Sequence, residues 1–229
     1  MIQTSPAMLA SAMLTAATCV RRGMLSMPTS RPYHHGDLRR RLIAVGEEVL
    51  AERGMAGLSL REVARRLEVS HNAPFKHFAS REALLAAMAE QGFADLVARQ
   101  AAAEADEPDA GILARGLAYV TFALERPAIF RLMFSGEVGA ERHPDLAARA
   151  SVSLSEIAAR IGQVFGPENA EDATLSAWSF VHGLAHLLLD GQIPPALRAG
   201  RTDREVARAV LVAMGHGLGY GAAGAEDPA

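Results

Sequence analysis

Apolar residues recur at helical spacing through nearly every segment of this chain after residue 36, and this pattern constrains its fold more than any other feature. Segment 37–53 illustrates it, with one apolar face made of Leu38, Leu42, Val45, Val49 and Leu50. Sustained apolar–polar alternation with regular turn signals, which half-buried strands would show, is not found. The sequence therefore predicts an all-α fold.

Glycine, proline and capping residues divide this pattern into helices. Gly54 and Gly57 are expected to end the first helix, and the Ser59–Glu62 capping box to start a short second one. A turn over residues 68–70 leads to a third short helix at about 71–77, capped by Ser70 or Asn72. Ser80 then caps a fourth helix that runs to about residue 105. Beyond the break at 104–109, helices are expected at 110–125, 127–134, 144–165, 168–190 and 203–218.

Composition excludes several classes of protein. Half of the 229 residues are hydrophobic, which is enough to form a core, so the chain as a whole is not intrinsically disordered. The single cysteine, Cys19, excludes an internal disulfide framework and a cysteine-based zinc site. The first point favours a globular protein and the second a reducing cytoplasm. We expect neither a metal nor a cofactor.

The net charge of −3 conceals an uneven distribution. Residues 31–81 hold 10 Lys and Arg against 6 Asp and Glu, whereas residues 82–229 hold 11 against 20. A basic segment on an acidic body favours local contact with a polyanion.

Residues 1–30 are set apart from the fold. Their apolar run over 6–20 precedes Arg21 and Arg22, whereas a secretory signal carries its positive charge first. The run is also shorter than the roughly 20 residues that span a bilayer. We interpret residues 1–30 as a disordered extension or a mis-called start, with Met24 and Met27 as alternative starts, and expect no membrane partner.

Residues 59–78 (SLREVARRLEVSHNAPFKHF) have the form of a helix-turn-helix. Two short helices are joined by a tight turn and braced by a longer helix. Such an arrangement places the second short helix in a major groove about 12 Å wide. Short polar side chains at its start leave room for base edges, and Lys76, the only lysine of the chain, provides a cation beside them.

On these residues, segment 36–96 resembles the DNA-binding domain of TetR-type transcriptional regulators. The likeness runs from HGDLRRRLIAVGEEVLAERG through SLREVARRLEVSHNAPFKHF to ASREALLAAMAEQGF. Segment 178–184 (WSFVHGL) is similar to the Trp-His-Gly signature of one subclass of TetR ligand domains, which places a ligand-binding and dimerisation domain at 106–219. The resemblance implies a ligand-responsive homodimer, most often a repressor, that binds a palindromic double-stranded DNA operator and a small-molecule effector.

The resemblance also assigns the residues that contact DNA. The third helix would read bases, and His77 and Arg81 would face phosphates. Phe75 stands where the family usually has a tyrosine whose hydroxyl binds a phosphate. The predicted DNA-binding residues are His71, Asn72, Ala73, Pro74, Phe75, Lys76, His77 and Arg81.

The ligand site is expected among the aromatic residues of the C-terminal half, which are otherwise ordinary core residues. Its predicted members are Phe122, Phe130, Met133, Phe134, Trp178 and His182, with His182 as the polar anchor. His182 and His186 are four residues apart, which suits either a metal pair or a satisfied core pair. We favour the core pair, because a third ligand is missing nearby.

The apolar faces of helices 168–190 and 203–218, including Leu188 and Val210, are predicted to form the dimer interface. Two other functions remain open from the sequence. One is a TetR-like ligand-binding protein that does not bind DNA. The other is a helical-bundle enzyme that uses His182 and His186, although no nucleophile–base set or phosphate loop supports catalysis.

Overall fold

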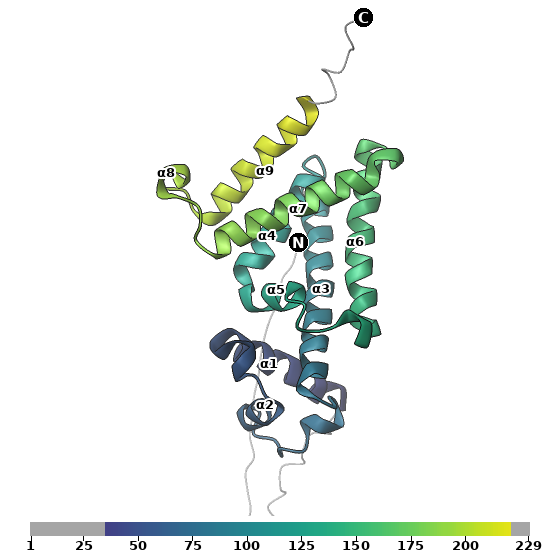
Figure 1. Ribbon diagram of the computed structural model, residues 1–229, viewed down its shortest axis with the longest axis vertical. Coiled ribbons are helices and arrows are strands. Elements are labelled where there is room, and N and C mark those ends of the chain that lie inside the picture. Colours follow the sequence, from purple (N-terminus) through teal and green to yellow (C-terminus); the bar gives the residue numbers. More distant parts are fainter. Residues whose placement is uncertain (1–34, 221–229) are drawn as a thin grey trace, which may run out of the picture. The chain divides into compact units, whose positions relative to one another are not determined.

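The computed structural model describes residues 35–220, and every regular element within this range is a helix (Figure 1). In chain order the elements are α1 (His35–Gly57), α2 (Leu60–Arg66), η1 (Pro74–Lys76), α3 (Arg81–Asp106), α4 (Ile112–Glu125), α5 (Pro127–Phe134), η2 (Ala140–Arg142), α6 (Pro144–Phe165), η3 (Pro167–Asn169), α7 (Ala170–Leu189), α8 (Pro195–Arg198) and α9 (Asp203–Tyr220). The predicted all-α class is confirmed.

The interpretation of residues 1–30 concerns a segment outside the described residues. None of the described helices combines the length and apolarity needed to cross a membrane.

We call residues 35–80 the head, and its packing follows from the apolar pattern of the sequence. Leu42 and Val49 of α1 and Val63 of α2 are fully buried in one core cluster. The backbone leaves the helical conformation at Gly54, where φ is 66°, which is a value that glycine adopts without strain. Ser59 then caps α2, because its Oγ accepts a hydrogen bond of 3.1 Å from the Glu62 N–H.

The predicted third helix at 71–77 is wrong as an α-helix. Residues 71–73 form turns, and only residues 74–76 form a 3₁₀ helix. Pro74 has no N–H with which to reach the Ser70 carbonyl, so this carbonyl accepts from the Ala73 N–H instead, at 2.8 Å. Neither proposed cap precedes a helix, since Ala73 is the residue before η1 and Ser70 Oγ accepts from the Asn72 N–H.

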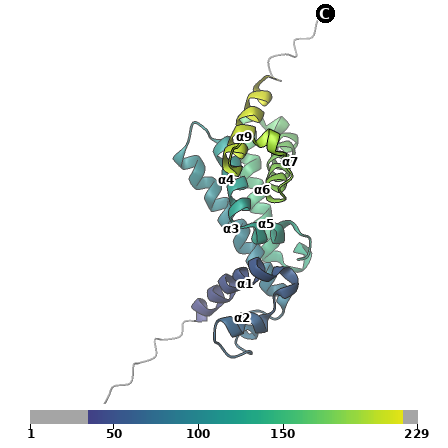
Figure 2. The same cartoon turned by 90° about the vertical axis from the view of Figure 1, so that its left-hand side faces the viewer.

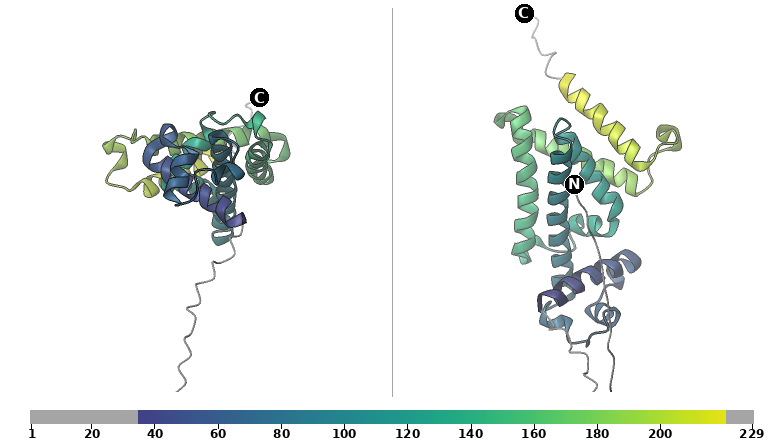
Figure 3. Two further views of the ribbon diagram at one scale, coloured as in Figure 1. Left: turned by 90° about the horizontal axis from the view of Figure 1, so that it is seen from below. Right: turned by 180° about the vertical axis from the view of Figure 1, so that it is seen from behind.

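The helix α3 connects the head to the rest of the chain. Ser80 caps it as predicted, with the Ala83 N–H donating to Ser80 Oγ at 3.1 Å. Farther along, α3 lies between α4 and α6 (Figures 1 and 3). Gly92 brings α3 close to α5, since a Cβ atom there would come within 2.7 Å of Ile129 Cγ2 and of Met133 Sδ. Contact between α1 and α5 completes the junction with the head, which Figure 2 shows from the side.

We call residues 107–220 the body. Its helices α7 and α9 both pack on α4, where a second core cluster includes Val120, Leu184 and Leu211. Sequence analysis did not predict the short helix α8. It begins at Pro195 and ends before Ala199, which has a left-handed φ of 50°.

The residues predicted for the dimer interface require a correction. Leu188 is buried within its own chain, and Val210 is half-buried against the same cluster of residues from α4, α7 and α9. The outward side of α7 carries Leu187 instead, which is 44% exposed. A helical repeat locates an apolar stripe but does not say whether that stripe meets its own chain or a second one.

Candidate functional site

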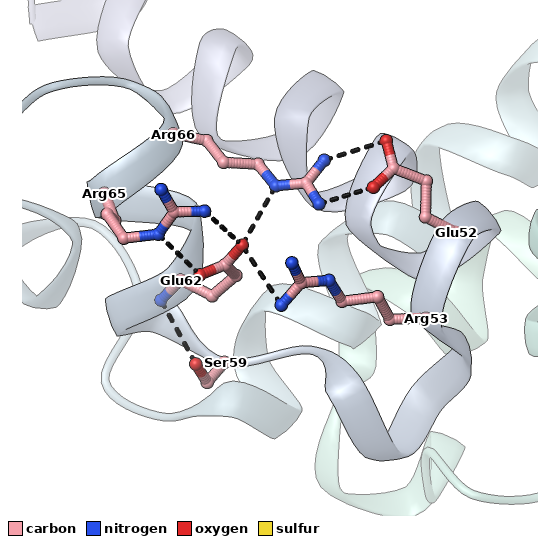
Figure 4. A network of polar contacts seen from close by, with 6 residues as sticks. All are labelled: Glu52, Arg53, Ser59, Glu62, Arg65 and Arg66. Atoms are coloured by element: carbon pink, nitrogen blue, oxygen red, sulfur yellow. Dashed lines mark hydrogen bonds and ion pairs between the residues drawn. The ribbon is translucent and has the colours of Figure 1, made fainter.

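A network of charged side chains fixes the orientation of α2 against α1 (Figure 4). Glu62 accepts hydrogen bonds from Arg65 at 2.8 and 2.9 Å and from Arg66 at 3.1 Å, and Arg53 of α1 lies 3.4 Å away. Arg66 also binds Glu52 of α1 through both Nη atoms. Hydrogen bonds from Arg65, then from Arg66, lower the pKa of Glu62 to about 2. The Glu62 carboxylate therefore binds arginines rather than closing the predicted capping box.

The predicted base-reading segment follows this network and is largely exposed. The eight predicted residues divide by exposure: His71, Asn72, Phe75 and Lys76 are exposed; Ala73, His77 and Arg81 are half-buried; Pro74 is buried. Pro74 therefore packs into the head instead of offering its ring to a base. The neighbouring Phe78 is buried, as expected of a core residue, and Arg39 stacks over its ring at 5.4 Å.

Two features of this segment suit contact with a nucleic acid. Lys76 is exposed, and none of the described carboxylates pairs with it, so its charge is available to a polyanion. Phe75 is 48% exposed, an unusual position for a large apolar side chain. Without a hydroxyl, Phe75 offers an apolar ring where a tyrosine would offer a hydrogen bond.

Arg81 has a structural role that the sequence did not reveal. Its Nε donates to the Leu58 carbonyl at 3.0 Å, and one Nη donates to the Met55 carbonyl. The side chain thereby ties the start of α3 to the loop between α1 and α2. Three of the five N–H donors of the guanidinium remain for other partners.

A cavity of about 1250 Å³, partly open to solvent, lies between α3, α4, α5, α6, α7 and α9. Of the six predicted ligand residues, Met133, Phe134 and Trp178 line it. Phe122 and Phe130 are wholly buried core residues away from its wall. Other lining residues include Phe93, Leu96, Gln100, Leu113, Gly116, Tyr119, Leu154, Ile157, Val164, Phe165, Ser176, Phe180, Val181, Leu211 and Met214.

His182 reaches the cavity through Tyr119. Tyr119 lines the wall, and its hydroxyl is hydrogen-bonded to His182 Nδ1 at 2.8 Å. Burial raises the pKa of Tyr119, while burial and, to a smaller extent, the charge of His186 lower the pKa of His182. Both side chains are therefore held in their neutral forms.

Sequence analysis missed two polar residues of the wall, Tyr119 and Gln100. Gln100 is 6% exposed, and its Nε2 donates to the Arg115 carbonyl over a long distance of 3.4 Å. The signal that would have found it is a polar residue within an apolar stripe, four positions after the buried Leu96.

The histidine pair is confirmed as close neighbours, with the His182 and His186 rings 4.7 Å apart. Within the described part of the chain, no three His, Cys, Asp or Glu side chains converge on a possible metal position. Phe130 packs against both rings, and Phe134 packs against that of His182. Gly183, the glycine of segment 178–184, does not line the cavity. It is exposed, and a Cβ atom there would meet nothing within 4 Å.

Arg126 links the body to the head. It lies between α4 and α5 and donates to Glu47 of α1 at 2.5 Å and to Asp95 of α3 at 2.7 Å. Burial raises the pKa of Glu47, an effect that the hydrogen bond from Arg126 partly opposes. The same short helix α5 carries Met133 and Phe134 into the cavity wall.

Family models match both parts of the chain. Residues 42–88 match the model of bacterial regulatory proteins of the tetR family, and residues 112–214 match that of the tetracyclin repressor-like C-terminal domain. The chain belongs to the TetR family. It is a DNA-binding, ligand-responsive transcription regulator with a helix-turn-helix, and not an enzyme. The Trp-His-Gly subclass stays a prediction, because the matched C-terminal model does not specify it.

Solved structures share this TetR fold. A protein with unknown function from Rhodococcus sp. RHA1 is 34% identical with a TM-score of 0.70, over 82% of this chain and 98% of that one. A tetR-family regulatory protein from Rhodococcus RHA1 is 23% identical with a TM-score of 0.57, over 76% and 93%. The multidrug binding protein EbrR complexed with imidazole is 24% identical with a TM-score of 0.51, over 76% and 93%. The last two show a common fold alone. No curated protein matches the chain.

Proposed function

We propose that this chain is a cytoplasmic homodimeric repressor whose two heads bind a palindromic operator until a small molecule enters the cavity of the body. The observation that carries the proposal is the exposed set of His71, Asn72 and Lys76 on a rigidly braced helix-turn-helix. Because Glu52 and Glu62 hold α2 against α1, little conformational freedom is lost when the head docks on DNA.

Within this proposal, His71, Asn72 and Lys76 contact base edges, whereas Ala73 and Phe75 make apolar contacts with bases or sugars. His77 and Arg81 face phosphates, Arg81 through the donors that its two carbonyl partners leave over. Pro74 shapes the turn that presents these side chains, since it is buried. A helical N-terminus at Arg81 adds backbone N–H groups on the phosphate side.

The test begins with genomic fragments that the protein retains, followed by titration of the recovered duplex. Lys76→Ala is expected to weaken binding or to relax the preference at one base pair by about 1–3 kcal/mol. Arg204→Ala, which removes an exposed cation from α9, should leave the DNA affinity and the base preference unchanged. If no fragment is enriched and binding is insensitive to salt, the chain is a TetR-like ligand-binding protein without DNA binding.

The proposed dimer follows from the geometry of recognition. One head covers one half-site, so selective binding requires two heads on a palindrome. Leu175, Gly183 and Leu187 lie exposed on one side of α7. A second copy of the chain would bury this surface, and Gly183 would let the two α7 helices approach closely.

Ligand control of the head is supported by the position of α5. A molecule that displaces Phe134 or Met133 moves α5, which packs on α3 at Gly92 and on α1. The EbrR structure was solved with imidazole, which agrees with ligand binding in this fold. The repressor role is read from a reporter gene, whose transcription should rise when the protein is removed.

A further inference from the structure

We infer that the cavity of the body binds an uncharged, largely apolar molecule that carries a hydroxyl or carbonyl group, recognised by Gln100 and Tyr119. This inference rests on the proposed function, because it names the class of effector. The cavity of about 1250 Å³ exceeds the roughly 300–1,000 Å³ of ordinary ligand sites, so a long or polycyclic molecule fits.

The wall excludes a charged ligand. Among the described residues that line the cavity, none carries a charged side chain, and the polar ones are serines, Gln100 and Tyr119. An ion transferred from water into such surroundings loses its hydration and gains no counter-ion. A neutral molecule avoids this penalty and gains from burial of its apolar surface.

Arg115, whose carbonyl accepts from Gln100, has a guanidinium that is already paired with carboxylates. Arg115 binds Glu104 at 2.9 Å and lies 3.5 Å from Glu156, and Arg160 binds the other oxygen of Glu104. Two arginines thus meet two carboxylates, so the cluster has no excess charge to attract an acid or an amine. Burial raises the pKa of Glu104, but hydrogen bonds from Arg115 and Arg160 outweigh it and keep the carboxylate ionised.

The two polar side chains offer neutral hydrogen bonds. The Gln100 amide has two N–H donors and an acceptor oxygen, and among the described residues it makes only the long bond to the Arg115 carbonyl. The Tyr119 hydroxyl is hydrogen-bonded to His182 and also interacts with Trp178, which leaves it one lone pair to accept from a ligand hydroxyl. Arg115, whose carbonyl holds Gln100, and Tyr119 are four residues apart on α4, about 6 Å along its axis, so one ligand can contact both Gln100 and Tyr119.

Trp178 provides a direct probe of this cavity. It is the only tryptophan of the chain and part of the wall, so its fluorescence reports on occupancy. We would titrate the full-length protein at neutral pH with decan-1-ol, decanoate and decylammonium, which share one apolar chain and differ in charge. Isothermal titration of the same three compounds measures binding independently of the fluorophore.

Decan-1-ol is expected to bind at least about tenfold more tightly than either ion. Gln100→Leu should weaken decan-1-ol several-fold, whereas Gln91→Leu, on an exposed side of α3, should not. Tyr119→Phe tests the second group, and circular dichroism verifies that each variant is folded. Equal or tighter binding of decanoate or decylammonium would overturn the inference, as would binding of none of the three.

The test is separate from that of the proposed function, because it requires no DNA. Preference for an ion in a protein that still binds and releases its operator would reject only the ligand class. Loss of sequence-selective DNA binding, with decan-1-ol still preferred, would reject the proposed function and keep the ligand class.

Discussion

Arg126 and Glu47 form an ion pair of 2.5 Å between residues 79 positions apart in sequence. The same guanidinium holds Asp95 of α3, so one side chain joins α1 and α3 at the junction of α4 with α5. Because α5 also carries cavity residues, this junction lies between the cavity and the head. The ion pair thus physically connects α1 of the head to the helix that carries cavity residues.

Arg126→Ala is expected to lower the free energy of unfolding by about 1–3 kcal/mol, because Glu47 and Asp95 lose a charged donor at a partly buried site. Urea denaturation measures the change. Arg99→Ala is the matched control, since the pair of Arg99 with Glu125 is exposed and is worth about 0–1 kcal/mol. Equal losses of unfolding free energy in both variants would show that Arg126 joins the head and the body no more strongly than an exposed ion pair does.

Arg81 is expected to serve stability and DNA binding through different donors. Arg81→Ala should lower the stability of the protein and also remove a phosphate contact. The slope of log K for DNA binding against log salt concentration should then decrease in magnitude by about 0.9. Arg81→Lys keeps the charge but not the fork that holds the Leu58 and Met55 carbonyls, so it should lose stability and retain the slope. A wild-type slope for Arg81→Ala, measured by titration at several salt concentrations, would mean that the side chain does not contact phosphate.

Leu187→Glu is expected to convert the dimer to a monomer, because two copies of the charge would enter one apolar interface. Leu197→Glu places the same charge on α8, at a residue that is 66% exposed, and should leave the dimer intact. Analytical ultracentrifugation at micromolar protein concentration distinguishes monomer from dimer for each variant. A wild type that sediments as a monomer, or a Leu187→Glu protein that remains dimeric, would contradict the proposed interface.

The stability of the head should depend on pH through Glu62. Hydrogen bonds from Arg65, then from Arg66, hold the pKa of its carboxyl at about 2 in the folded state, below the ordinary value of 4.5 for a glutamate. Between these values the unfolded chain binds more protons than the folded one, so stability is lost as the pH falls below about 4.5 and approaches 2.

Denaturation across this pH range provides the measurement. Glu62→Gln should flatten the acid side of the stability profile. The control Glu68→Gln removes an exposed carboxylate from the neighbouring turn and should leave the profile unchanged. A Glu62→Gln profile as steep as the wild type would place the acid-sensitive group elsewhere.

Local patterns in the sequence were sufficient to predict the all-α class and most helices of the described chain. Helical spacing, the Ser59 and Ser80 caps and Gly54 depend on interactions within a few residues, which is why they can be recognised without a fold. Pro74 marks where this approach was incomplete. Its missing N–H was visible in the sequence, but the replacement of an α-helix by turns and a 3₁₀ helix emerged only from the actual hydrogen bonds.

Tertiary structure alone decided which side chains meet. The cavity places Gln100 and Tyr119 on one wall, Arg81 turns toward two carbonyls, and Leu187 rather than Leu188 faces outward. Neighbouring residues on a helix point in directions about 100° apart, so a small rotation of the helix decides which of them is buried. That rotation is set by packing between segments far apart in sequence, as the pair of Arg126 with Glu47 illustrates.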